Sequence, residues 1–337
     1  MRDAKHDGVV SRPIWNFILS PVSRILFPVL MLLLGCGYLG TALARTALIG
    51  GETVSALTRS EERAAALRAL GLPKVVVGDI ASDDWHAQLN PAGESIVNSV
   101  APATPGAEGY RHSFVEGAKS ITRWLEQSAA AGQAPAREFV FTSSTSVYPQ
   151  TDGGWVDENT PVDPPTLGPA GALLREAEDL LLALPPRLVR RVWILRLAGL
   201  YGPSRHHLLD ALRAGESHFP GDGAQWLNLL HRDDAVGAIR ACLGAMADIH
   251  GGIFNVTDDS PAPKRELVLW LARQLGRNPT QINFDAAVST RSHHRKNAAG
   301  KVPHRRMANG KIKAALPWRA QFPSYREGYA GLLSSSA

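Results

Sequence analysis

The chain has 337 residues, and its hydrophobic content of 45% is enough to bury a substantial core, which excludes a largely disordered protein. Its two cysteines, Cys36 and Cys242, are too few for a disulfide framework or a thiolate metal site, so we expect a reducing, cytoplasmic compartment. The net charge of +5 is modest and does not by itself indicate a nucleic-acid-binding protein.

The chain begins with a basic segment, which leads into an apolar run over residues 25–34. Arg24 and Pro28 interrupt this region, and a membrane-spanning helix needs about 20 apolar residues, so no membrane association is expected. Leu34-Gly35-Cys36 also resembles the cleavage box of a lipoprotein. Processing there would remove a strand and a glycine that the rest of the chain needs. We therefore expect residues 1–25 to be a poorly ordered extension.

Six short apolar runs alternate with helical patterns and are predicted to be strands. They cover residues 29–34, 53–57, 74–77, 95–100, 139–142 and 192–197. Continuous apolar strands between helices are typical of a parallel sheet covered on both faces, so the predicted fold class is α/β, a doubly wound Rossmann-type sheet. The rhythm changes after Pro203. This predicts a Rossmann domain over residues 26–203 and a smaller C-terminal substrate lobe over residues 204–337, with the option that the chain crosses back.

A glycine-rich loop, Gly35-Cys36-Gly37-Tyr38-Leu39-Gly40, lies between the first predicted strand and a predicted helix. With this spacing the first glycine permits a tight turn, the second lets the backbone approach a diphosphate, and the third lets helix and strand pack closely. The helix N-terminus adds amides and the positive end of its dipole. Gly35, Gly37, Tyr38, Leu39 and Gly40 are therefore predicted to bind a nicotinamide dinucleotide.

The end of the second predicted strand favours NADP over NAD. NAD-binding domains place an acidic residue about 20 positions after the loop, where it bonds the ribose hydroxyls. This chain has Thr58-Arg59-Ser60 there, which offers a cation and hydroxyls to a 2′-phosphate. Arg59 could instead be an ordinary exposed residue at a helix start. Asp79, after the third strand, is predicted to reach the adenine, unless it only caps a turn.

Four further motifs follow the loop in order. They are 141–149 (FTSSTSVYP), 195–203 (LRLAGLYGP), 228–234 (NLLHRDD) and 254–258 (FNVTD). Together they resemble the extended short-chain dehydrogenase/reductases, which include the NAD-dependent epimerase/dehydratases, from about residue 30 to residue 330. The resemblance implies a Rossmann domain with a substrate lobe, and it implies a homodimer.

The resemblance also assigns a catalytic role to Ser144, which matches the hydroxyl that holds the substrate oxygen beside the nicotinamide. Ser144 could equally be a hydrogen-bonding serine at a strand end. In the family, a tyrosine and a lysine four residues apart on the next helix complete the chemistry, because the ammonium lowers the pKa of the phenol. Aligning that helix on Glu176-Ala177-Glu178 puts Ala170 and Leu174 at these positions, and a shift by one puts Gly171 and Arg175 there. The chain therefore resembles an atypical member that lacks the dyad.

Three other side chains could supply a proton, namely Tyr148, His112 and His231. Tyr148 is retained as a candidate catalytic residue, although it could instead be a packing residue after its strand. His231 is followed by Asp233 and could equally organise a helix start. The pairs His206-His207 and His293-His294 have no acidic or thiolate partner at metal-ligand spacing, so no metal is expected.

The positive charge of the chain comes from eight basic residues in a stretch without acidic residues: Arg291, Arg295, Lys296, Lys301, Arg305, Arg306, Lys311 and Lys313. They form either a solvated loop or a rim that attracts an anionic substrate. No nucleic-acid recognition motif accompanies them. The favoured function is an NADP-dependent oxidoreductase or epimerase/dehydratase-like enzyme on a small polar or anionic substrate. The alternative is a non-catalytic NADP-binding sensor or regulatory module.

Overall fold

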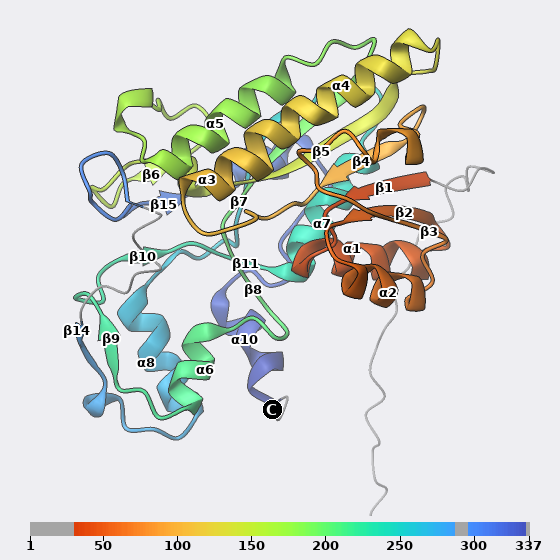
Figure 1. Cartoon of the computed structure of the whole chain (residues 1–337). Coiled ribbons are helices and arrows are strands. Elements are labelled where there is room, and N and C mark those ends of the chain that lie inside the picture. The colour runs from red at the N-terminus through yellow and green to blue at the C-terminus, as the bar shows by residue number, and fades with distance from the viewer. Residues whose placement is uncertain (1–29, 287–295, 335–337) are drawn as a thin grey trace, which may run out of the picture.

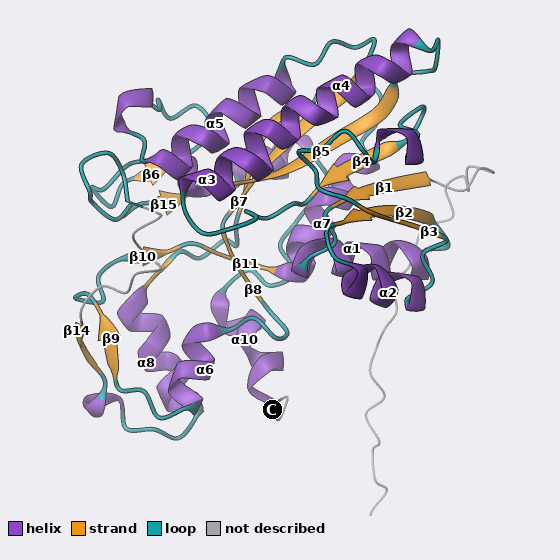
Figure 2. Cartoon of the chain, viewed as in Figure 1, coloured by secondary structure: helices purple, strands orange, loops and turns teal. Residues whose placement is uncertain are grey.

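The computed structural model describes residues 30–286 and 296–334. The expected extension, residues 1–25, lies outside the described residues, as do Arg291, Arg295, His293 and His294. The described chain forms a central sheet with helices on both faces, and a smaller lobe lies beyond one end of the sheet (Figures 1 and 2).

The central sheet has seven parallel strands in the order β12-β7-β5-β4-β1-β2-β3. They are β1 (Leu30–Leu34), β2 (Thr53–Thr58), β3 (Lys74–Val77), β4 (Ser95–Asn98), β5 (Ala136–Ser144), β7 (Val189–Leu197) and β12 (Gly252–Val256). All six predicted strands are present, which confirms the doubly wound α/β fold. The chain runs outward from β1 to β3 and returns on the other side of β1 as β4. The sheet therefore has a topological switch point between β1 and β4, where ligands of such folds bind.

Helices cover both faces because successive strand residues point to opposite sides of the sheet. On one side are α1 (Tyr38–Ile49), α2 (Glu61–Ala69) and α7 (Arg232–Leu243); on the other are α3 (Ala107–Tyr110), α4 (Gly117–Ala130) and α5 (Pro169–Leu182), with a π-helical segment, Arg111–Glu116, between α3 and α4 (Figure 1). Leu33 of β1 packs in the cluster with α1 and α7. The next residue, Leu34, packs in the cluster with α4 and α5.

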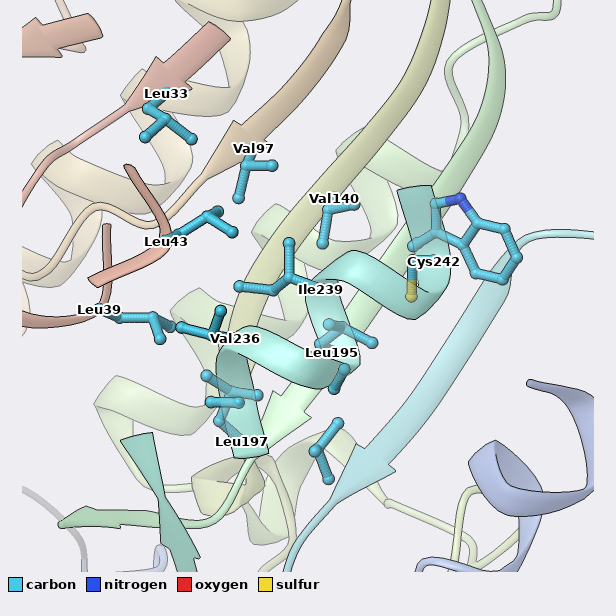
Figure 3. Packing of buried hydrophobic residues seen from close by; sticks show 14 of the residues in the cluster. Leu33, Leu39, Leu43, Val97, Val140, Leu195, Leu197, Val236, Ile239 and Cys242 are labelled. Carbon is cyan, nitrogen blue, oxygen red and sulfur yellow. The ribbon is translucent and has the colours of Figure 1, made fainter. Parts of the chain in front are cut away.

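The domain boundary predicted at Pro203 does not follow the elements of the structure. Val236 and Ile239 of α7 lie against the sheet beside Val140 and Leu195 (Figure 3), and β12 is the seventh strand of the sheet, paired with β7. Both elements come after Pro203. The chain thus leaves the sheet, crosses back for α7 and β12, and leaves again, which is the option that the pattern had left open.

The smaller lobe gathers around a third apolar cluster, formed by α6 (His207–Arg213), α8 (Lys264–Gln274) and α10 (Tyr325–Ser334). Four pairs of short strands lie in the lobe or between it and the domain: β6 (Trp155–Val156) with β15 (Arg306–Met307), β8 (Gly199–Tyr201) with β11 (Leu229–His231), β9 (His218–Pro220) with β14 (Asn283–Ala286), and β10 (Trp226–Leu227) with β13 (Ala262–Pro263). α9 (Gly310–Ala315) returns to the domain, where Ile312 joins the α1/α7 cluster. Among the described helices, none has the length and apolar character needed to cross a bilayer.

Candidate cofactor and active site

The glycine-rich loop lies at the switch point of the sheet, directly after β1. The amide of Gly35 donates to the carbonyl of Leu57 at 2.9 Å, and the amide of Ser99 donates to the carbonyl of Leu34 at 2.8 Å. These bonds tie the loop to the ends of β2 and β4, its two neighbours. A ligand bound at the loop would therefore lie at the carboxyl edge of the sheet, between β1 and β4.

Each of the three glycines has its own physical reason. Gly35 has a φ of +86°, which disfavours any residue with a side chain. A β-carbon at Gly40 would lie 2.4 Å from the carbonyl oxygen of Gly35, so the third glycine allows α1 to approach the strand. A β-carbon at Gly37 would have no described atom within 4 Å. The space beside Gly37 is therefore open, and it is where a diphosphate would meet the backbone amides at the start of α1.

Tyr38 and Leu39 follow the second glycine and begin α1. The side chain of Leu39 is buried in the core cluster, so only its backbone amide is left to meet a ligand. The ring of Tyr38 is half-buried, and the guanidinium carbons of Arg205 and Arg232 each lie 5.4 Å from its centre. The sequence analysis did not identify Arg205 and Arg232 as candidate site residues. They are far from the loop along the chain, and only folding brings them to it.

The end of β2 offers Arg59 and Ser60 to solvent, whereas Thr58 is 8% exposed. Ser60 caps α2, because its hydroxyl oxygen accepts the amide of Arg63 at 3.2 Å. Arg59 is exposed at this strand end, and its positive charge acts on the carboxylate of Asp79. Thr58 is too enclosed to match the predicted role of a phosphate-binding hydroxyl.

Asp79 follows β3 and is held in two ways. Its carboxylate accepts the amide of Ala81 at 2.9 Å, and both of its oxygens lie within 3.0 Å of His112 Nε2. Partial burial opposes ionisation of Asp79, but the Ala81 amide and His112 outweigh it and lower the pKa. His112 is thus engaged with the carboxylate after β3, which argues against its use as a proton donor.

Ser144 is the last residue of β5 and is half-buried. Its hydroxyl oxygen accepts the amide of Ser146 at 3.2 Å and caps a 3₁₀ turn, Thr145–Val147. Ser144 therefore makes the hydrogen bond that the sequence analysis allowed for a serine at a strand end. It does not exclude the other role, since the bond uses Ser144 as an acceptor and leaves the hydroxyl proton to be donated.

The dyad positions on α5 carry no acid or base. Ala170 is 6% exposed and Leu174 is 1% exposed, and Leu174 belongs to the apolar cluster under α5. In the shifted alignment, Gly171 packs on the carbonyl oxygen of Ser146, while Arg175 pairs with Asp179 at 2.9 Å. The face of α5 that lies along β5 is therefore part of the core.

Tyr148 is a structural residue, so its interpretation as a catalytic residue is not supported. Its side chain is fully buried, and its hydroxyl donates to Asn255 Oδ1 at 2.9 Å while it accepts from Arg196 Nη1 at 2.8 Å. Arg196 in turn forms a buried ion pair with Glu178 of α5. Burial raises the pKa of Tyr148. The packing interpretation, which the sequence had left open, is the one that the contacts support.

His231 organises the start of α7. Its Nδ1 accepts the amide of Asp233 at 3.3 Å, so the ring proton of the neutral form sits on Nε2. The ring is buried against Tyr201 and Phe322. Burial lowers the pKa of His231, although Asp233 opposes this. A buried, neutral histidine that caps a helix fits the second interpretation given above.

Part of the described basic stretch is held by packing and an ion pair, whereas Lys301 is exposed in a loop and Lys311 is exposed near the start of α9. Arg305 is 7% exposed and donates to the carbonyl of Thr145, and Arg306 lies over the rings of Trp155 and Trp226 at 5.1 Å each. Lys313 forms an ion pair with Asp259. These side chains fasten residues 305–313 onto the domain. The solvated-loop interpretation is therefore wrong for these three residues, because each of them contacts a carbonyl, an aromatic ring or a carboxylate that lies far from it in the sequence.

Comparison with known proteins agrees with this architecture. Residues 31–257 match the NAD dependent epimerase/dehydratase family. The chain is 33% identical over 258 residues to Protein YeeZ of Escherichia coli (strain K12), covering 74% of this chain and 85% of that protein. It is 31% identical over 310 residues to the 3-diazoavenalumate denitrifying reductase of a Streptomyces species, covering 87% and 96%. A solved structure with a similar fold is a double mutant of DesIV, a dTDP-glucose 4,6-dehydratase from Streptomyces venezuelae, with a TM-score of 0.71, 24% identity, and coverage of 90% and 95%.

Proposed function

The chain belongs to the NAD-dependent epimerase/dehydratase family, and from this premise we propose that it is an NADP-preferring reductase of a small polar or anionic substrate held beside Ser144. The observation that carries the proposal is the loop at the switch point. Gly37 faces open space at the start of α1, and Ser144 ends β5, the strand next to β4 in the sheet.

The preference for NADP is supported by the end of β2. Arg59 is exposed there, and no ion pair or hydrogen bond occupies its side chain among the described residues. A guanidinium binds a phosphate through two parallel hydrogen bonds, which makes arginine suited to a 2′-phosphate. No carboxylate follows the strand to accept the ribose hydroxyls that NAD presents, since Thr58, Arg59 and Ser60 fill these positions.

The nicotinamide, when bound, supplies a hydride. Gly37 and the amides after it would hold the diphosphate, Arg59 the 2′-phosphate, and Ser144 would donate its hydroxyl proton in a hydrogen bond to a substrate atom. Asp79 would lie at the adenine end. Arg205 and Arg232 add positive charge beside Tyr38, which favours anionic ligands at the mouth of the site.

The missing tyrosine and lysine narrow the type of substrate. Reduction of a carbonyl carbon leaves an oxyanion that needs a proton, and the family uses the dyad for it. Hydride transfer to a carbon that bears a cationic diazonium group forms a C–H bond while the C–N bond breaks and N2 leaves, so the charges balance and no oxyanion needs a proton. One relative, 31% identical to this chain, is named a 3-diazoavenalumate denitrifying reductase, and this name describes a reduction of the second type. The apolar residues at the dyad positions, Ala170 and Leu174, favour the second type.

The test is oxidation of NADPH, followed by absorbance at single turnover, against two sets of substrates. One set holds aldehydes, ketones and nucleotide sugars; the other holds aryl diazo compounds with a carboxylate. We expect oxidation in the second set, and we expect Ser144→Ala to slow it by about 100-fold, in the range for a lost hydrogen bond that positions the substrate, with unchanged NADPH affinity. Absence of oxidation in both sets would contradict the proposal.

The buried, apolar dyad positions also favour a second candidate, a protein that binds NADP without turnover and acts through a partner. This function depends on the loop and not on Ser144. It therefore requires Gly37→Val to abolish function in cells and Ser144→Ala to leave it intact. The opposite result, with Ser144→Ala inactive and normally folded, would return the choice to the reductase.

A further inference from the structure

Two arginines from distant segments meet at the start of α1. Arg205 lies in the segment between β8 and α6, and Arg232 is the first residue of α7. Both guanidinium groups lie over the ring of Tyr38, with 5.4 Å from each guanidinium carbon to the ring centre. Arg232 Nε donates to Asp233 at 2.9 Å, which neutralises part of its charge. Within the described residues, Arg205 has no ion-pair partner and is exposed.

A strained turn holds Arg205 in this position. Gly202 and Arg205 exchange two backbone hydrogen bonds of 3.1 and 3.0 Å around Pro203 and Ser204. Ser204 has a φ of +62°, and it is the one non-glycine residue with a positive φ in the described chain. A serine in this region costs energy that a glycine would not. The turn is thus fixed by its closing bonds, and it presents the next side chain, Arg205, toward the loop.

The hydroxyl of Tyr38 points into the same place. A β-carbon at Gly202 would lie 2.8 Å from Tyr38 Oη and 3.1 Å from His231 Nε2, so the hydroxyl sits against the Gly202 backbone. It is buried and has no hydrogen-bond partner in the described part of the chain. Buried hydroxyls normally have a partner, so this one lacks a group that can accept from it or donate to it. The neighbouring residue, Gly37, faces open space.

We propose that Arg205, Arg232 and Tyr38 form a diphosphate clamp, which binds the phosphate bridge of the dinucleotide together with the backbone amides at the start of α1. The clamp presupposes the dinucleotide site proposed above and adds three residues to it, two of them from outside the loop. Arg205 supplies the free positive charge, Arg232 a partly neutralised one, and the Tyr38 hydroxyl donates to a phosphate oxygen. Cofactor binding is thereby linked to the turn that connects the sheet to the lobe.

The shared chemistry is a diphosphate, which a nucleotide-sugar substrate could also supply. The position favours the dinucleotide, because Tyr38 immediately follows the loop and belongs to the same helix start. The two sources differ in a measurable way. A clamp on the dinucleotide acts in the absence of any substrate, whereas a substrate clamp changes the affinity for UDP and leaves that for NADPH as it was.

The test is calorimetric titration of the full chain with three probes: NADPH, 2′,5′-ADP, which has no diphosphate bridge, and UDP. We expect Arg205→Ala to weaken NADPH by about 10-fold, as for the loss of one charge-assisted bond, and to leave 2′,5′-ADP within about twofold. Tyr38→Phe should weaken NADPH by about two- to tenfold. Neither variant removes a hydrogen bond of the described fold, so both should melt like the parent chain. Arg45→Ala, an exposed arginine farther along α1, serves as the control and should bind NADPH normally.

Three results would overturn the clamp while leaving the dinucleotide site in place. They are unchanged NADPH affinity of Arg205→Ala, an equal loss for 2′,5′-ADP and NADPH, and a loss confined to UDP. If the parent chain itself binds neither NADPH nor NADH, the proposed function fails together with the clamp. If Arg205→Ala and Tyr38→Phe weaken only NADPH, the clamp stands.

Discussion

Two regions at the carboxyl edge of the sheet have opposite characters. Around the loop after β1, backbone and side chains leave space: Gly37 faces no neighbour, and the hydroxyl of Tyr38 has no partner among the described residues. Along α5, beside the end of β5, the space is filled: Ala170 and Leu174 are buried. The loop side thus has room for a ligand, whereas the side chains of Ala170 and Leu174 on α5 are part of the core.

The α5 side contains a buried network of charged and polar side chains. Glu178 is fully buried and forms bonds of 2.6 to 3.2 Å with Arg196, and Ser143 donates to it at 2.6 Å. Arg196 then reaches Tyr148 and, through it, Asn255. These residues connect α5 to β5, β7 and β12. Polar groups on this side therefore stabilise the fold, while those on the loop side are left for a ligand.

The largest expected effect tests the structural character of the α5 side. Glu178→Ala leaves the Arg196 guanidinium buried without its carboxylate, so we expect a loss of about 3–5 kcal/mol in the free energy of unfolding. The measurement is urea denaturation. Glu176→Ala, an exposed glutamate on the same helix whose contact with Arg111 is 3.8 Å long, should change stability by less than about 0.5 kcal/mol. Equal stability of the two variants would remove the distinction between the regions.

The second prediction concerns the open side. Gly37→Val should weaken NADPH binding by about 100-fold, because the side chain fills the space where charged hydrogen bonds of about 3 kcal/mol in total would form. Because a β-carbon at Gly37 meets no described atom within 4 Å, we expect stability to stay within about 1 kcal/mol. Calorimetry and thermal melting measure the two quantities. Gly310→Val at the start of α9, where a β-carbon also meets open space, should affect neither. A destabilised Gly37→Val would mean that the space is not open.

The third prediction sharpens the description of the loop side by resolving its adenosine end. Arg59→Ala should weaken NADPH by about 10-fold, the equivalent of one phosphate contact, and leave NADH unchanged. Titration of both dinucleotides measures the ratio, with Arg45→Ala as the control. If the two affinities change together, Arg59 does not read the 2′-phosphate and the chain is indifferent between NADP and NAD.

The last prediction is pH-dependent and concerns Asp258, which lies just after β12 and outside both regions. Burial raises the pKa of Asp258 to about 8, and the nearby carboxylates of Asp259 and Asp234 add to this. Between about pH 4 and pH 8 the folded chain therefore holds a proton that the unfolded chain releases, so stability should fall as the pH rises through this range. Asp258→Asn should flatten the fall, whereas Asp248→Asn, an exposed control, should not. An unchanged slope would show that Asp258 ionises normally.

The sequence pattern alone was sufficient to predict the strands of the sheet and the position of the glycine-rich loop. Strands buried on both faces are continuous apolar runs, and the roles of Gly35, Gly37 and Gly40 depend on spacing that is local in the chain. The absence of a tyrosine and lysine on α5 was also visible, because the alignment needs only one helix. These features share a cause: each depends on residues within a few positions of one another.

Tertiary structure decided what depends on distant residues. The burial of Tyr148 depends on Arg196 and Asn255, the placement of Arg205 beside Tyr38 depends on the turn at Ser204, and the assignment of β12 to the sheet depends on its pairing with β7. The sequence allowed the basic residues between 305 and 313 to form a solvated loop, and only the folded structure showed the contacts that hold them. Local sequence determines which groups the chain possesses; long-range packing determines which of them are used within the fold and which remain for a ligand.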